Sequence, residues 1–130
     1  MSAAPQTTEV PTIVLDSTDQ APRRARRFLA EQFARWGITD DYTGRLVVCE
    51  LATNAYKHGE GPIVVRLFLD PDDGRPVIEV SDTGTGHATV QPQNYNATSG
   101  RGLQLMAELV HEWGVKRLTG GGKVVWAKLP

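Results

Sequence analysis

The sequence predicts an α+β fold in which helices cover one face of a largely antiparallel sheet. Two segments, residues 19–37 and 41–58, have the apolar spacing of amphipathic helices, and a third helix is expected from Leu103 to about His111. Short β-branched segments bounded by turn signals predict strands at residues 12–15, 63–69, 76–81, 113–118 and 123–129. Their order is not the strand–helix alternation that builds a parallel sheet. We therefore expect a two-layer α/β sandwich with a mixed, largely antiparallel sheet and about three helices on one face.

Composition places the chain among ordinary globular domains. It has 130 residues, 40% apolar and 22% charged, with a net charge of −1. This charge gives no positive field that would favour nucleic acid. One cysteine, no signal-peptide pattern and no stretch of membrane-spanning length predict a cytoplasmic protein that contacts neither nucleic acid nor membrane directly. Residues 1–11 are expected to be a disordered tail, and residues 12–130 a single domain.

The first helix has Pro22 near its first turn and Gly37 at its end. Its apolar positions repeat with the helical period, at Ala21, Ala25, Phe28, Leu29, Phe33 and Trp36. Arginines occupy much of the remaining surface, at positions 23, 24, 26, 27 and 35. They form either a solvated helix surface or a docking face for an acidic partner.

The second helix, from about Asp41 to His58, is where we expect the chemistry. Glu50 and Asn54 lie one turn apart on the same face, and this pair suits magnesium or a base beside a metal-bound phosphate. A solvated polar face is the simpler alternative. Gly59 is expected to end the helix in the left-handed conformation. The residues expected to point inward are Leu46, Cys49, Ala52 and Tyr56.

Asp82-Thr83-Gly84-Thr85-Gly86 follows the strand at residues 76–81, which a turn at residues 70–74 joins to the strand before it. Asp82 could accept a hydrogen bond from an exocyclic amine, while Gly84 and Gly86 let a planar base lie against the chain. The alternative is a plain turn.

A polar segment, His87 to Ser99, reads as an ordered loop or a lid. Gly100-Arg101-Gly102 then opens the third helix, whose free N–H groups would form an anion site. Arg101 either pairs with phosphate or faces solvent. A flexible hinge before a packed helix is the alternative.

In combination these motifs resemble the GHKL (Bergerat-fold) ATP-binding domain shared by gyrase, Hsp90, sensor histidine kinases and MutL. Glu50 to Gly59 is similar to that family's N box, Asp82 to Gly86 to its G1 box, and Gly100 to Leu103 to its G2 box. The resemblance extends from about Ile13 to Leu129. The compact length and the form of the N box look most like the stand-alone anti-sigma factor serine/threonine kinases.

The resemblance implies a role for each matched position. Asn54 would ligate Mg²⁺ on the phosphates of ATP, and Glu50 would be the general base. Asp82 would recognise the adenine amine, and residues 87–99 would be the lid. The other nucleotide-binding positions implied are Lys57, Gly84, Gly86, Gly100, Arg101, Gly102 and Leu103.

One region departs from the family pattern. Many members have a threonine or serine near the final strand that supports adenine recognition, often through water. Here Lys123-Val124-Val125 occupies that region. Either another hydroxyl, such as that of Thr83, substitutes, or the adenine contact is weaker.

The leading functional hypothesis is an ATP- and Mg²⁺-dependent protein serine/threonine kinase of the anti-sigma type. By resemblance, it would bind a sigma factor, phosphorylate a small anti-anti-sigma (STAS-type) protein, and form a homodimer. The alternative is an ATP-binding regulatory module that holds its partner without catalysis. A detached histidine kinase catalytic domain is less favoured, because no histidine-bearing dimerisation helices precede the domain.

Overall fold

The computed structural model describes residues 9–84 and 106–130 of the chain. The elements in order are β1 (Thr12–Leu15), α1 (Ala21–Arg35), α2 (Tyr42–His58), β2 (Ile63–Leu69), β3 (Pro76–Asp82), β4 (Glu112–Arg117) and β5 (Lys123–Lys128). Residues 106–109 form one further helical turn, within the third predicted helix. Residues 1–8 of the predicted tail and residues 103–105 of that helix lie outside the described residues.

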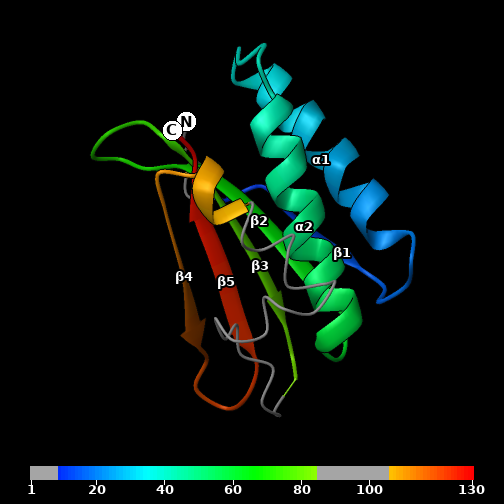
Figure 1. Ribbon diagram of the computed structural model, residues 1–130. Coiled ribbons are helices and arrows are strands. Elements are labelled where there is room, and N and C mark those ends of the chain that lie inside the picture. The colour runs from blue at the N-terminus through cyan, green and yellow to red at the C-terminus, as the bar shows by residue number, and fades with distance from the viewer. Residues whose placement is uncertain (1–8, 85–105) are drawn as a thin grey trace, which may run out of the picture.

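The strands form one sheet in the order β1-β2-β3-β5-β4, and every described pair is antiparallel. Both α1 and α2 lie on the same side of this sheet (Figure 1). The predicted α+β sandwich is therefore confirmed, with a described sheet that is wholly antiparallel rather than mixed. None of the described helices is long and apolar enough to cross a lipid bilayer.

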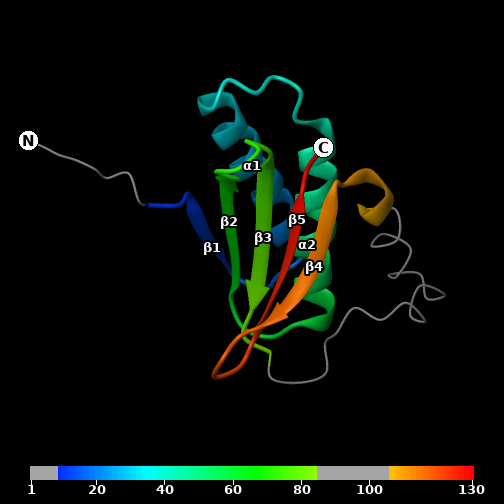
Figure 2. The same ribbon diagram turned by 90° about the vertical axis from the view of Figure 1, so that its left-hand side faces the viewer.

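The core lies between the sheet and the two helices. In β2 and β3 the residues that face the helices alternate with residues on the other face, as the period of two in a strand requires. The helix layer and the sheet layer both contribute buried residues to this core, including Leu29, Phe33, Val48, Leu51, Ile63, Val65, Leu67, Ile78 and Val80. The opposite face of the sheet carries the ion pair between Arg66 and Glu79, and no described helix covers it (Figure 2).

The buried face of α2 differs from the predicted one. Leu46 and Tyr56, expected to point inward, are 42% and 38% exposed. The buried stripe consists mainly of glycine, alanine and valine, together with one leucine, at Gly44, Val47, Val48, Leu51, Ala52 and Ala55. A Cβ atom at Gly44 would lie only 3.1 Å from the Phe33 ring, so these short side chains let α2 pack closely against α1. Of the predicted inward residues, Ala52 is buried and Cys49 is half-buried.

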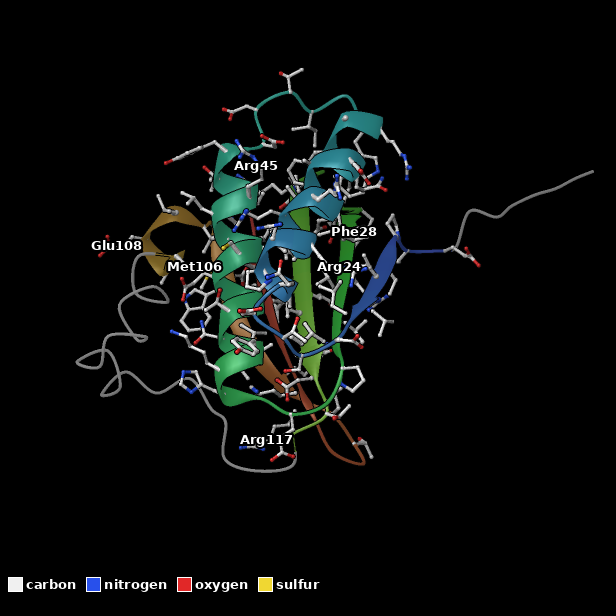
Figure 3. The ribbon with its side chains drawn as sticks, turned by 90° about the vertical axis from the view of Figure 1, so that its right-hand side faces the viewer. Arg24, Phe28, Arg45, Met106, Glu108 and Arg117 are labelled. Atoms are coloured by element: carbon white, nitrogen blue, oxygen red, sulfur yellow. The ribbon has the colours of Figure 1, made fainter. Side chains whose placement is uncertain are left out.

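Three elements meet at one end of the sheet: the C-terminal end of α2, the C-terminal end of β3 and the start of β5 (Figures 1 and 2). The strand register places Asp82 directly opposite Lys123 across β3 and β5. Viewed from the helix side, the turn that carries Met106 and Glu108 lies beside α2 (Figure 3). Met106 is buried and belongs to the core. The predicted site residues that the structure describes lie on α2 and at this end of the sheet.

Candidate functional site

Glu50 and Asn54 are held together on α2 by their own hydrogen bonds. The Nδ2 of Asn54 donates to the Oε2 of Glu50 at 3.1 Å and to the Glu50 backbone carbonyl at 2.9 Å. Both side chains are half-buried. Since the amide nitrogen is used by Glu50, the carboxamide oxygen of Asn54 is the atom that a hard cation can use.

The carboxyl group of Glu50 is a stronger base than an exposed glutamate. Burial raises its pKa above the ordinary value, against the lowering effects of the hydrogen bond from Asn54 and of the Lys57 ammonium. Lys57 is exposed and lies two turns after Glu50 on the same side of α2. A half-buried carboxylate with a raised pKa, next to a potential cation ligand, suits proton abstraction.

Asp82 lies at the end of β3 and is only 4% exposed. Its Oδ1 accepts the N–H of Gly84 at 2.8 Å, and its Oδ2 accepts a hydrogen bond from the Nζ of Lys123 at 2.6 Å. Lys123 is itself buried, so the two charges form a buried ion pair. Removing one partner from such a pair leaves the other charge unpaired and typically costs about 3–5 kcal/mol.

Glycines surround the carboxyl group and backbone of Asp82. A Cβ atom at Gly59 would lie 2.5 Å from the carboxyl carbon of Asp82, and one at Gly84 would lie 2.9 Å from its Oδ1. A Cβ atom at Gly122 would lie 2.6 Å from the Asp82 carbonyl oxygen. The end of β3, the end of α2 and the start of β5 therefore meet at distances that no larger residue allows.

The expectation that Gly59 adopts the left-handed conformation is wrong. Its φ is −100° and its ψ is −169°, which is extended backbone open to any residue. Close approach to Asp82, rather than backbone conformation, is what requires glycine at this position. Gly59 still caps α2, because its N–H donates to the carbonyl of Ala55.

Thr83 is tied to the segment that follows α2. Its backbone N–H and its hydroxyl both donate to the carbonyl of Glu60, at 2.9 and 3.1 Å. The hydroxyl proton that would support a bound base is therefore used locally. Val124 is the strand partner of Ser81, and Lys123 is the partner of Asp82. Because successive side chains in a strand alternate between faces, the Val124 side chain lies on the face opposite to that of Lys123 and Asp82. Among residues 123–125, Lys123 is the one that contacts Asp82.

The described part of the predicted site is elongated. Asn54 precedes Gly59 by five residues, which is about 7.5 Å of rise along a helix axis. Asp82 and Gly84 therefore mark one end, next to Gly59, and Glu50 and Asn54 lie further along α2. The remaining predicted positions lie outside the described residues: Gly86, the lid at 87–99, Gly100, Arg101, Gly102 and Leu103.

Lys123, Gly122 and Glu60 belong to this region but were not predicted as site residues. A lysine directly before the apolar run Val124-Val125-Trp126-Ala127 is a visible signal in the sequence. Its partner is not visible, because Lys123 and Asp82 are 41 positions apart and only the register of β3 and β5 brings them together.

Comparison with known proteins agrees with this architecture. A family model described as the histidine kinase-like ATPase domain matches residues 15–129, which include α2, Asp82 and β5. A comparison with curated proteins gave no significant match. Because the family match covers most of the chain, from the end of β1 to just after β5, the chain belongs to the histidine kinase-like ATPase domain family.

Proposed function

We propose that the protein is an ATP- and Mg²⁺-dependent protein serine/threonine kinase of the anti-sigma type. It binds a sigma factor and phosphorylates a STAS-type anti-anti-sigma protein. Membership of a histidine kinase-like ATPase family implies an ATP-binding regulatory function, and the kinase chemistry is our extension of it. The observation that carries this extension is the half-buried Glu50 carboxylate, whose pKa burial raises and which Asn54 holds one turn away.

The described residues fit ATP with magnesium. Each oxygen of Asp82 accepts one hydrogen bond from the residues that the structure describes, and a carboxylate oxygen can accept two, which leaves capacity for an exocyclic amine. Gly59 and Gly84 have no side chains that would cover this carboxylate. The carboxamide oxygen of Asn54 suits Mg²⁺, which takes few protein ligands and keeps phosphate oxygens and waters.

When bound, ATP supplies the γ-phosphoryl group and magnesium neutralises charge on the phosphates. Asn54 would hold the metal through its carboxamide oxygen. Glu50 takes the proton of the attacking serine or threonine hydroxyl, as that oxygen bonds to phosphorus and ADP leaves. Lys57, exposed on the same side of α2, offsets negative charge near the phosphates.

The exposed arginines of α1 support a partner-binding role. Arg23, Arg24, Arg27 and Arg35 are exposed in the structure, on the helix surface that does not pack against the core. Four cations on one helix favour an acidic protein surface as the partner and raise the association rate. We propose this face as part of the contact with the sigma factor or its antagonist, in a homodimeric protein.

The experiment is phosphoryl transfer from radiolabelled ATP to a co-purified partner, compared between wild type and Glu50→Gln. Loss of a general base lowers transfer by about 10²- to 10⁴-fold, and ATP affinity should stay within about threefold. Because Glu50 must be unprotonated, transfer by the wild type should rise as pH increases through its raised pKa. Arg66→Ala, on the uncovered face of the sheet, is the control.

Two results would contradict the proposal. Unchanged transfer by Glu50→Gln would show that Glu50 is not the base. ATP-dependent retention of the partner without any transfer of label would instead identify a binding module that uses ATP without catalysis.

A further inference from the structure

Lys123, which forms a buried ion pair with Asp82, has no role in the function proposed above. The Nζ of Lys123 lies 2.6 Å from the Oδ2 of Asp82, and the two side chains are 10% and 3% exposed. A lysine ammonium has three N–H donors, and its hydrogen bond to a described residue uses one of them. Counting only partners in the described part of the chain, Lys123 therefore keeps free N–H donors beside a carboxylate that can still accept hydrogen bonds.

We propose that Lys123 is a second base-contacting residue, which donates a hydrogen bond to a purine ring nitrogen beside the exocyclic amine. Asp82 accepts from the amine itself. The inference rests on the proposed binding of ATP and adds a residue that determines which base is recognised.

Complementarity of donors and acceptors supports this assignment. An adenine edge presents an amine N–H donor next to a ring-nitrogen acceptor. Asp82 and Lys123 present the inverse, an acceptor and a donor within hydrogen-bonding distance of each other. Their Cα atoms are direct partners across β3 and β5, so both side chains leave the sheet on the same face.

The described side chains next to this pair, those of Thr83 and Val124, do not offer the same donor. The hydroxyl of Thr83 donates to the Glu60 carbonyl, and Val124 lies on the opposite face of the sheet. Among the described side chains, Lys123 is thus the one that hydrogen-bonds Asp82 and can also donate to a base beside it. The competing explanation is that Lys123 only neutralises the buried charge of Asp82.

Ligand changes separate these two explanations in the wild-type protein. We would titrate it with ATP and with two analogues in which carbon replaces N1 or N7 of the purine, the two ring nitrogens that flank the amine. The loss of one charge-assisted hydrogen bond should weaken one of these analogues by about tenfold or more relative to ATP. Equal affinity for all three nucleotides would overturn the role of Lys123.

Substitutions then assign the effect to the side chain. Lys123→Met should lower ATP affinity to that of the weakened analogue and abolish discrimination between the two. Lys123→Gln keeps an N–H donor and should retain part of the discrimination between the two analogues. Lys116→Met is the matched control, since Lys116 is exposed and pairs with Val124 on the other face of the sheet. Discrimination that survives in Lys123→Met would assign the contact to another residue.

Failure of the proposed function looks different. If the folded wild type binds no ATP at millimolar concentration, both the proposed ATP binding and the proposed contact of Lys123 are wrong. If ATP binds but the analogues bind equally well, only the contact is wrong. Because the analogue series needs no variant, it tests the ring-nitrogen contact even if Lys123→Met folds poorly, and the partial loss of discrimination in Lys123→Gln then assigns the contact to Lys123.

Discussion

At the scale of single residues, Asp82 fits into its site because three neighbouring positions are glycines, which have no side chain. Gly59, Gly84 and Gly122 come from three different segments, and a Cβ atom at any of them would lie within 3.0 Å of an atom of Asp82. Glycine at 59 and 84 was expected from the motifs, but the physical reason at 59 is different. Gly59 is required because a buried carboxylate lies against it, and sequence patterns carry no information about such contacts.

Gly59→Ala should therefore damage the site as well as the fold. The new Cβ atom would lie 2.5 Å from the Oδ2 of Asp82 and 2.8 Å from the Ala55 carbonyl oxygen. Overpacking of this kind costs about 1–3 kcal/mol of unfolding free energy. We expect ATP affinity to fall at least about tenfold as Asp82 is displaced, since a lost charged hydrogen bond has this size. Urea unfolding and nucleotide titration measure the two effects.

The control is Gly74→Ala, in the turn between β2 and β3. Gly74 has a φ of +76° and no atom within 4 Å of its Cβ position, so alanine there costs backbone strain of about 1 kcal/mol without a clash. The Gly74→Ala variant should bind ATP with the affinity of the wild type. Wild-type affinity in Gly59→Ala would show that the position of Asp82 does not control nucleotide binding.

At the scale of elements, helix and strand bounds could be predicted from the sequence but the orientation of α2 could not. Apolar spacing and turn residues located α1, α2 and the hairpins to within about two residues. On α2 two overlapping stripes have the helical period, and the prediction placed Leu46, Cys49, Ala52 and Tyr56 inward. The buried stripe contains Gly44, Val47 and Ala55 instead, because the shape of the surface beneath α2 decides which stripe fits.

A matched pair of substitutions tests this orientation. Val47→Ala removes two methyl groups from a fully buried position and should lower the unfolding free energy by about 1–3 kcal/mol. Leu46→Ala removes a larger group from a side chain that is 42% exposed, and should cost less than about 1 kcal/mol. Urea denaturation of both variants gives the comparison. A larger loss for Leu46→Ala would restore the orientation predicted from the sequence.

At the scale of the whole molecule, the site depends on contacts between distant parts of the chain. Glu50 and Asn54 are four residues apart, so one helix is sufficient to join them, and the sequence predicted their proximity. Asp82 and Lys123 are brought together by pairing β3 with β5. Sequence spacing does not encode that register, which is why Lys123 was noticed only as a departure from a pattern. Contacts within one helix could therefore be predicted from the sequence, whereas contacts made by strand pairing could not.

Because α2, β3 and β5 all contribute to the site, nucleotide binding should stabilise the whole domain against unfolding. A ligand that binds only the folded state adds about 2.7 kcal/mol at a free concentration of 100 times Kd. For a domain of this size, that corresponds to a rise in Tm of about 10 °C. Thermal melts followed by circular dichroism at increasing ATP concentration, with Mg²⁺ present, measure the rise.

Two comparisons locate the origin of this stabilisation. Chelating the metal should reduce the rise in Tm, since Asn54 then loses the cation that links it to the phosphates. Asp82→Asn should reduce it further, because a neutral amide is a weaker acceptor for the base amine than a carboxylate and also weakens the pair with Lys123. Arg66→Ala, in the exposed pair with Glu79 on the uncovered face of the sheet, should melt with the full ATP-dependent rise. A Tm that does not respond to millimolar ATP in the folded wild type would contradict nucleotide binding at this end of the sheet.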